Sequence, residues 1–193
     1  GTYCNSPHEP GMVHFDLTRS LEEGYTEFLF DLICPTVVII CTGMTWVDGC
    51  EKDVEKCELL NHLGPVHVAN IASKFNCKPV WFSTDYVFNG DNGPYDEDDT
   101  PDPVNQYGKS KLSGEIDMMK HTNALILRVN SVYGPETVGK NFVYQVAQER
   151  LNNIPFDQFG TPTYSRDIAS ACKQLLDLNA HGLVHITGDE FMS

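Results

Sequence analysis

The sequence predicts an α/β protein built on a doubly wound parallel sheet. Three short apolar runs rich in β-branched residues recur along it: "TVVIIC" (36–41), "KPVWFS" (78–83) and "ALILRV" (124–129). Each run is continuous rather than alternating, which is typical of strands buried on both faces of a parallel sheet. A helical pattern lies in each interval between them, as expected of right-handed strand–helix–strand units.

The first interval contains one predicted helix, residues 53–75, with the sequence "DVEKCELLNHLGPVHVANIASKF". Its apolar residues recur near the helical period, which predicts one face turned toward the sheet. These residues are Val54, Cys57, Leu60, Val68, Ile71 and Ala72.

The second interval combines an acidic loop with a helix. The loop "NGDNGPYDEDDTPDP" (89–103) is rich in turn-forming residues and is predicted to be solvated at the surface. The segment "QYGKSKLSGEIDMMKH" (106–121) follows, and Leu112, Ile116 and Met119 are expected to form its apolar stripe. Further on, "SRDIASACKQLLDL" (165–178) predicts a helix with Ser165 as its N-cap, and "GLVHIT" (182–187) predicts another strand.

Composition restricts the classes of partner. The 193 residues suffice for one domain with a core, and the formal net charge of −14 argues against nucleic acid or an anionic membrane as a partner. We find neither an apolar run of about 20 residues nor a signal-peptide layout, so the protein is predicted to be cytoplasmic. The seven cysteines have no C-x-x-C spacing, which favours buried free thiols over a metal site or disulfides.

Ligands of open α/β sheets bind beyond the carboxyl ends of the strands. The residues that follow the predicted strands there are Cys41, Thr42 and Gly43, then Ser83, Thr84 and Asp85, then Asn130 and Ser131. Tyr107 and Lys111 stand four residues apart and so share one helix face near that edge. On spacing alone, this pair could equally be the solvated start of a helix.

Ordered motifs add a family resemblance that covers nearly the whole chain. The segments "TVVIICTGMTWVDGCEKD" (36–53), "STDYVFNG" (83–90), "GPYDEDDTPDPVNQYGKSKLSGE" (93–115), "LRVNSVYG" (127–134) and "DQFGTPTYSRDIA" (157–169) lie in the family's order and spacing. Together they resemble the dTDP-4-dehydrorhamnose reductase branch of the extended short-chain dehydrogenases/reductases. The resemblance implies a Rossmann-type nucleotide-binding core over 1–134 and part of a substrate-binding region over 135–193.

The resemblance also assigns catalytic roles. Tyr107 and Lys111 match the family's Tyr-x-x-x-Lys, and Thr84 occupies its catalytic Ser/Thr position. Reduction of a ketone needs an acid within about 3 Å of the carbonyl oxygen. A neighbouring ammonium and the positive charge of the oxidised nicotinamide would each favour the phenolate and are expected to bring the pKa of Tyr107 closer to working pH. Lys111 would also bind the nicotinamide ribose, and Thr84 the carbonyl oxygen.

Binding residues are carried over in the same way. The resemblance assigns cofactor contacts to Asp16, Leu17, Cys41, Thr42, Gly43, Asn61 and Ser83, besides Tyr107 and Lys111. It assigns substrate contacts to Asp85, Tyr86, Phe88, Asn130, Gln158, Pro162 and Thr163. Asp16 could instead be only a helix N-cap, Asn61 a mid-helix residue bonded to backbone, and Tyr86 and Phe88 core residues. No metal is expected.

The sequence departs from the family pattern at three places. It contains no G-x-x-G-x-x-G motif, so the first strand–helix unit is expected to be absent, and part of the C-terminal lobe likewise. The opening "GTYCNSP" has no acidic residue of the kind that selects NAD, and Ser6 and His8 could face a 2′-phosphate, which favours NADPH, with NADH as the alternative. Where the family often has an aromatic residue against the sugar, this sequence has "RVNS" (128–131), so the identity of the sugar is not predicted.

Two functions follow from the resemblance. The first is NADPH-dependent reduction of the 4-keto group of a nucleotide-linked 6-deoxysugar, by a protein that could form a homodimer. If the native chain begins at Gly1 and so lacks the glycine motif, we expect it to bind a dinucleotide poorly. The second is that of the regulatory β subunit of methionine adenosyltransferase, which shares the fold and would have the catalytic subunit of that enzyme as its partner.

Overall fold

The main sheet has four parallel strands, as predicted. The computed structural model describes residues 1–4, 11–135, 141–148 and 158–192. Its strands β3 (Val37–Ile40), β4 (Lys78–Thr84), β5 (Leu125–Val129) and β8 (Gly182–Ile186) lie in the order β3-β4-β5-β8. All three pairings are parallel, with Trp81 opposite both Ile40 and Ile126. The four predicted strands are therefore confirmed.

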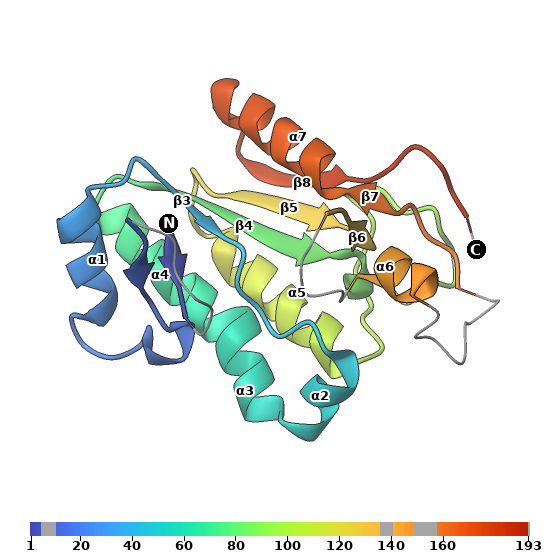
Figure 1. Cartoon of the computed structure of the whole chain (residues 1–193), viewed down its shortest axis with the longest axis horizontal. Helices are drawn as coiled ribbons and strands as arrows, with labels where there is room; N and C mark the ends of the chain where they lie inside the picture. Colours follow the sequence, from blue (N-terminus) through green and yellow to red (C-terminus); the bar gives the residue numbers. More distant parts are fainter. Residues whose placement is uncertain (5–10, 136–140, 149–157, 193) are drawn as a thin grey trace.

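Helices cover both faces of this sheet (Figure 1). Helix α7 (Ser165–Asp177) lies on one face, where Ile168 and Cys172 pack with Val80, Leu125 and Leu127. Helices α4 (Gly64–Lys74) and α5 (Gln106–Met118) lie on the other. Successive strand side chains point to opposite faces, so that alternate residues of one strand enter two different cores. The core under α4 and α5 includes Ile71, Ala72, Trp81, Met118 and Ile126.

The helix predicted over 53–75 exists, and it contains a turn of π-helix. It consists of α3 (Val54–Glu58), the π-helical turn η2 (Leu59–Leu63) and α4, without interruption. The Asp53 side chain caps it by accepting a hydrogen bond from the backbone N–H of Lys56 at 3.1 Å. A π-turn inserts one extra residue and often marks a functional position. Asn61 lies in this turn.

Helix α5 is confirmed, but its predicted apolar stripe is wrong. Ile116 and Met119 are 59% and 52% exposed, and Leu112 is half-buried. The buried face instead carries small and polar residues because α5 packs closely against β4 and η2, where no space for a large side chain remains. The residues of this face are Gly108, Ser110, Lys111, Gly114, Glu115 and Met118.

The remaining elements are short or peripheral. The strands β1 (Thr2–Tyr3) and β2 (Val13–His14) form a separate parallel pair beside η1 (Leu17–Arg19) and α1 (Tyr25–Ile33). The elements α2 (Val47–Lys52) and η3 (Asp85–Val87) follow β3 and β4, respectively. A second parallel pair, β6 (Val132–Tyr133) and β7 (Thr163–Tyr164), lies near α6 (Phe142–Ala147).

Two local expectations are corrected by the structure. β3 is not buried on both faces, since it is an edge strand of the four-stranded sheet and Ile39 is 49% exposed. The N-cap of α7 is Tyr164, which makes no side-chain cap, and Ser165 is the first helical residue. The division at residue 134 stays a prediction, although β8 pairs with β5 and so joins residues from both sides of it in one sheet.

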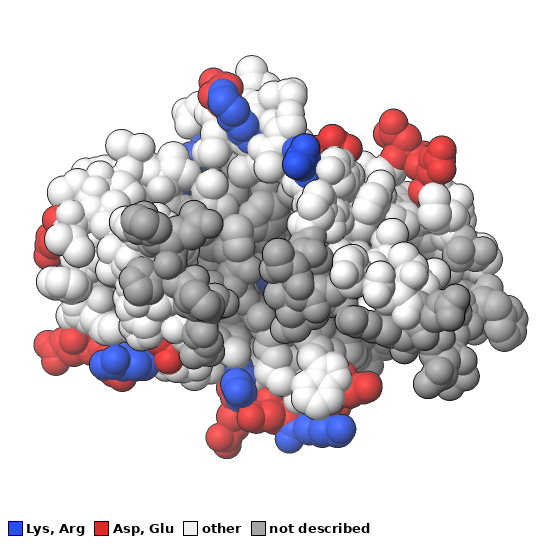
Figure 2. All heavy atoms as spheres, viewed as in Figure 1, with Lys and Arg blue, Asp and Glu red and all other residues white. Residues whose placement is uncertain are grey.

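The surface agrees with the charge of the sequence. On the face shown in Figure 2, Lys and Arg lie at separated places, close to Asp and Glu. None of the described helices is both long and apolar enough to span a membrane. The seven thiols are free, as predicted, but only Cys50, Cys57, Cys77 and Cys172 are buried, whereas Cys34 and Cys41 are exposed. The described residues hold no cluster of three or more His, Cys, Asp or Glu suited to a metal ion.

Candidate active site at the carboxyl end of the sheet

Thr84 ends β4 and is 5% exposed. Its hydroxyl caps the following turn η3 by accepting from the backbone N–H of Tyr86 at 3.3 Å, and it donates to Oδ1 of Asp85 at 3.1 Å. The hydroxyl is thereby fixed in direction at the edge of the sheet where ligands of this fold class bind. Burial raises the pKa of the neighbouring Asp85 carboxyl.

The start of α5 is pressed against this turn, and Gly108 makes that approach possible. A Cβ atom at residue 108 would lie 2.1 Å from the backbone oxygen of Tyr86 and 2.9 Å from Cβ of Pro103. Asn105 caps the helix by accepting from the backbone N–H of Gly108 at 2.8 Å. The glycine inside "QYGKSK" therefore brings Tyr107 to the end of β4.

The Tyr107 phenol lies beside Thr84 and stays protonated at neutral pH. Burial raises the pKa of Tyr107 to about 12, and the hydrogen bond with Thr84 opposes that shift. Asp85, Cys50 and Tyr86 raise the pKa further. The expectation that Lys111 brings this pKa closer to working pH is therefore wrong for the chain without its cofactor, because burial dominates and Lys111 is not among the groups that lower the pKa of Tyr107. A protonated phenol is suited to donate a proton.

The Lys111 ammonium is enclosed between α5 and β4. The residue is 5% exposed; Nζ donates to the backbone oxygen of Phe82 at 2.5 Å and lies 3.9 Å from the ring centroid of Trp81. Burial lowers the pKa of Lys111 to about 7, against the opposing effects of Glu115 and Cys57. An ammonium has three N–H donors, so this arrangement leaves donors for a hydroxyl acceptor such as a ribose. The residues thus fit the nicotinamide end of a dinucleotide.

Asn61 holds the loop after β3 from inside the protein. Its Oδ1 accepts from the backbone N–H of Met44 at 2.8 Å, and its Nδ2 donates to the backbone oxygen of Met44 at 3.0 Å. The same Nδ2 lies 3.2 Å from Oγ of Ser110 and 3.4 Å from Sγ of Cys57. The Asn61 side chain is fully buried and bonds to the backbone of Met44. It therefore matches the alternative interpretation, a polar residue within a helix that bonds to backbone. Its cofactor contact stays a prediction.

The other predicted cofactor residues lie in three places: at the start of η1, after β3 and within β4. Asp16 is the N-cap of η1, which was the alternative to a cofactor contact: its Oδ1 accepts from the backbone N–H of Thr18 at 2.9 Å. The next residue, Leu17, is buried. Cys41 borders an apolar groove of about 400 Å³ between β3 and α7, and the exposed Thr42 and Gly43 follow it. Ser83 is buried at β4, while Ser6 and His8 lie outside the described residues.

The predicted substrate residues divide between surface and core. Tyr86 is 41% exposed, and its ring meets the Tyr107 ring edge-on with centroids 5.6 Å apart, so it borders the site. Phe88 is 8% exposed and stacks on Tyr95 with ring centroids 4.3 Å apart. It is therefore a core residue, as the alternative interpretation of Phe88 expected. The acidic loop is mostly exposed, as predicted, although Asn89, Tyr95, Pro101 and Pro103 are half-buried. Oε1 of Glu97 accepts from the backbone N–H of His185.

The remaining substrate residues gather around the end of β5. Asn130 follows this strand, and a Cβ atom at Gly160 would lie 3.0 Å from Nδ2 of Asn130. Thr163 is buried in β7 and accepts from the backbone N–H of Gly188, next to the half-buried Pro162. Gln158 is exposed. The structure therefore brings Asn130 close to the segment 160–163, but the substrate roles stay predictions.

Sequence reasoning missed the buried charges behind this site. Glu115 and Arg128 form an ion pair of 2.7 Å whose side chains are 4% and 5% exposed. A signal was available, because a charged residue inside an apolar strand such as "ALILRV" requires a buried partner. Glu115, four residues after Lys111, is the acidic residue that provides this partner for Arg128.

Comparison with known proteins agrees with this geometry. The family model described as RmlD substrate binding domain matches residues 16–193. The chain belongs to this family. Among its relatives, the spore coat polysaccharide biosynthesis protein SpsK of Bacillus subtilis is 36% identical over 98% of the chain and 70% of that protein. Methionine adenosyltransferase 2 subunit beta of Xenopus laevis is 30% identical over 93% of the chain and 57% of that protein.

Solved structures of RmlD-family proteins share the fold. A hypothetical dTDP-4-dehydrorhamnose reductase from Sulfolobus tokodaii has a TM-score of 0.87 at 33% identity and covers 98% of the chain. A dTDP-4-dehydrorhamnose reductase from Bacillus anthracis, in complex with NADP, has a TM-score of 0.84 at 30% identity and covers 95% of the chain. The chain covers 67% of each of these two structures. The predicted Rossmann-type fold and family are confirmed.

Proposed function

We propose that this protein reduces the 4-keto group of a nucleotide-linked 6-deoxysugar with NADPH, as a dTDP-4-dehydrorhamnose reductase does. One observation carries the proposal: a protonated Tyr107 phenol lies beside the Thr84 hydroxyl, on a helix whose next turn buries the Lys111 amine. Ketone reduction requires such an acid beside a group that can hold the carbonyl oxygen.

Each of the three residues has one role in the proposed reaction. Thr84 turns its single hydroxyl hydrogen from Oδ1 of Asp85 to the substrate oxygen and so fixes the carbonyl next to Tyr107. Tyr107 transfers its phenolic proton to that oxygen as the alcohol forms. Lys111 donates to a ribose hydroxyl of the dinucleotide and holds it in register with the substrate. NADPH, when bound, supplies the hydride.

Two observations support NADPH and a nucleotide sugar. The opening segment "GTYCNSP" has no acidic residue that would bind a free 2′-hydroxyl, and the similar reductase from Bacillus anthracis is in complex with NADP. SpsK is named for polysaccharide biosynthesis, and the solved relative from Sulfolobus tokodaii is named as a hypothetical dTDP-4-dehydrorhamnose reductase. We assign the protein to the cytoplasm and take a homodimer as the assembly to be tested by light scattering.

The experiment mixes the full-length protein with NADPH and a dTDP-4-keto-6-deoxysugar and follows the nicotinamide absorbance. We expect turnover, and we expect Tyr107→Phe to lower kcat by about 10²- to 10⁴-fold with NADPH affinity retained, because only the proton donor is removed. Normal turnover by Tyr107→Phe would show that the role of Tyr107 is wrong. Absence of turnover by the wild-type protein would contradict the proposed reductase activity.

A second function is supported by a different observation. Several methionine adenosyltransferase 2 β subunits are relatives, that of Xenopus laevis at 30% identity. Under this alternative the protein binds a methionine adenosyltransferase catalytic subunit. Titration of the full-length protein with that subunit, followed by analytical ultracentrifugation, separates the two: a stable complex without sugar turnover favours the regulatory role, and turnover without a complex favours the reductase.

A further inference from the structure

The Glu115 carboxylate is buried and fully occupied by hydrogen bonds. The residue is 3% exposed. Its Oε1 accepts from Oγ of Ser83 at 2.5 Å and from Nε of Arg128 at 2.9 Å, while Oε2 accepts from Nη2 of Arg128 at 2.7 Å. Two parallel bonds between a guanidinium and a carboxylate fix both groups in direction as well as distance. Helix α5 is thus fastened to β4 through Ser83 and to β5 through Arg128.

Glu115 stands on the same face of α5 as the proposed catalytic pair. Tyr107, Lys111 and Glu115 follow one another at intervals of four residues, and side chains at that spacing lie above one another. Lys111 bonds the backbone of Phe82, and Glu115 bonds the side chain of the next residue, Ser83. The two side chains of α5 therefore hold consecutive residues of β4 immediately before Thr84.

The surroundings of Arg128 show that this carboxylate is its principal charged partner. Nη1 of Arg128 lies 3.2 Å from Nε2 of His185, and an arginine can only donate, so that nitrogen of His185 accepts and is unprotonated. The guanidinium also lies 4.9 Å from the ring centroid of Phe88. Burial lowers the pKa of His185, which agrees with a neutral ring.

The charges around Lys111 make Glu115 its main electrostatic support. The described groups that affect this amine are Glu115 on its own helix and Cys57 on α3, besides burial itself, which lowers the pKa of Lys111 to about 7. Glu115 is the stronger of the two opposing groups. The β4 side contributes the backbone oxygen of Phe82 and the ring of Trp81, neither of which carries a net charge.

We propose that Glu115 is a positioning residue of the reaction described above: its carboxylate fastens α5 to Ser83 of β4 and to Arg128 of β5, one helical turn after Lys111, and so holds the Lys111 side chain in place against β4. This inference rests on the proposed function for its catalytic consequence only. Because Glu115 is the stronger of the two groups that oppose the effect of burial, its loss should also move the pKa of Lys111 further below about 7, so that less of the amine is protonated to donate to a ribose hydroxyl. Glu115 acts through Lys111 and does not contact the reacting atoms.

The test follows the titration of Lys111 by NMR. The full-length protein is labelled with ¹³C-lysine, and the Cε signal of Lys111 is assigned by its loss in Lys111→Met. Glu115→Gln keeps the size of the side chain and removes its charge. We expect its Lys111 midpoint to fall by about one pH unit or more, and the matching limb of the kcat/KM profile to move with it. Glu115→Asp should restore most of both. Asp177→Asn, which removes the carboxylate of the exposed Lys173–Asp177 pair, is the control and should move neither.

A second variant separates the effect of the lost charge from a defect in folding. Glu115→Gln leaves the Arg128 guanidinium buried without its carboxylate, which is costly. The double variant Glu115→Gln/Arg128→Met removes both charges and should fold. Because the loss of the Arg128 charge alone favours the ammonium, the reference is Arg128→Met, and the Lys111 midpoint of the double variant should lie below that of Arg128→Met. Equal midpoints in these two variants would overturn the role of Glu115. A lowered midpoint in a protein whose wild type reduces no keto-sugar would support the coupling of Glu115 to Lys111 and contradict the proposed reaction.

Discussion

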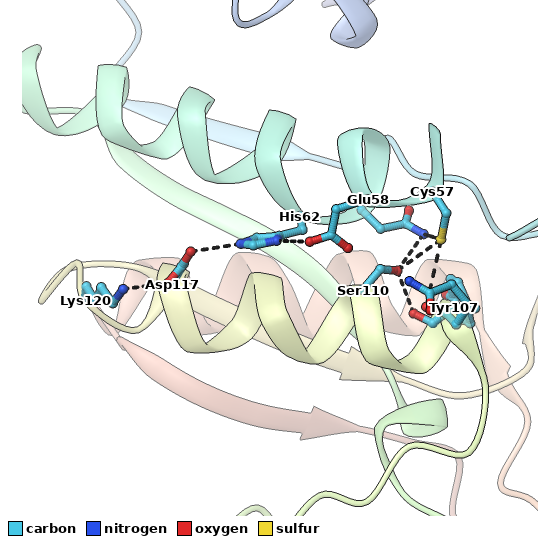
Figure 3. A network of polar contacts seen from close by, with 9 residues as sticks. Cys57, Glu58, His62, Tyr107, Ser110, Asp117 and Lys120 are labelled. Carbon is cyan, nitrogen blue, oxygen red and sulfur yellow. Dashed lines mark hydrogen bonds and ion pairs between the residues drawn. The ribbon is translucent and has the colours of Figure 1, made fainter. Parts of the chain in front are cut away.

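His62 and Asp117 join two helices that are distant in the sequence: Nε2 of His62, in the π-turn η2, lies 2.8 Å from Oδ2 of Asp117 on α5. The other ring nitrogen, Nδ1, lies 2.5 Å from Oε1 of Glu58, and Lys120 bonds the same Asp117 (Figure 3). An imidazolium donates through both nitrogens, and this arrangement offers each one a carboxylate. The bridge therefore holds α5, which carries Tyr107 and Lys111, against the helix that carries Asn61.

We predict a stability that depends on the protonation of His62. Burial alone would lower its pKa, but hydrogen bonds to Glu58 and Asp117 outweigh burial and raise the pKa above its ordinary value. The stabilisation is therefore fully present below about pH 6.5 and is lost as the pH rises through the higher folded-state pKa. His62→Gln should lower the free energy of unfolding by about 1–2 kcal/mol at pH 6, after allowance for partial exposure, and by less at pH 9.

Urea unfolding at a series of pH values measures this difference. His181→Gln, at an exposed position just before β8, is the control and should leave the pH dependence of the wild type in place. A constant difference between wild type and His62→Gln across the series would contradict the bridge.

Gly108→Ala should destabilise the protein. The added Cβ would lie 2.1 Å from the backbone oxygen of Tyr86, and a backbone atom cannot move aside as the end of a side chain can. Overpacking of this kind costs about 1–3 kcal/mol, which exceeds the gain in helix propensity. Chemical denaturation measures the loss, with Lys109→Ala as the exposed neighbour for comparison. Equal stability of the two variants would show that α5 can shift away from η3.

Lys111→Met should separate stability from function. Burial holds the pKa of the Lys111 amine at about 7, so protonating it in the folded protein is unfavourable. We expect Lys111→Met to unfold at the same or a higher denaturant concentration at pH 7, yet to lose binding of NADPH. The exposed Lys109→Met is the control and should retain binding.

The pH dependence of Lys111 has the opposite sign to that of His62. Between about pH 7 and 10.4 the unfolded chain binds more protons at this lysine than the folded chain does, so its cost to stability falls as the pH rises. The stability advantage of Lys111→Met over wild type should therefore shrink from pH 7 to pH 10. A growing advantage would mean that the amine is not buried as described.

Glu97 should protect one backbone amide of the edge strand β8. Its Oε1 accepts from the backbone N–H of His185 at 2.7 Å, and that bond lowers the pKa of Glu97. Glu97→Ala is expected to speed hydrogen exchange of the His185 amide by about tenfold, the equivalent of one hydrogen bond. Asp98→Ala, an exposed neighbour, should not change it. Acidification through the folded-state pKa of Glu97 should reproduce the effect in the wild type.

The sequence by itself determined the order of the elements. Continuous apolar runs predicted the four strands of the main sheet, and the helical period predicted the helices over 53–75, 106–121 and 165–178, because burial on both faces and the 3.6-residue period leave direct marks in residue order. The motif spacing predicted the family, which the match over residues 16–193 confirms.

Only the tertiary structure decided what α5 packs against and how its side chains are charged. Leu112, Ile116 and Met119 suggested an apolar stripe, but the buried face carries Gly108, Lys111 and Glu115, since close contact with β4 and η2 selects small residues and paired charges. The pKa values of Tyr107 and Lys111 likewise depend on burial and on partners from other segments, among them Thr84 and Cys57. Local sequence cannot report these distances, because they arise when strands and helices far apart along the chain are brought together.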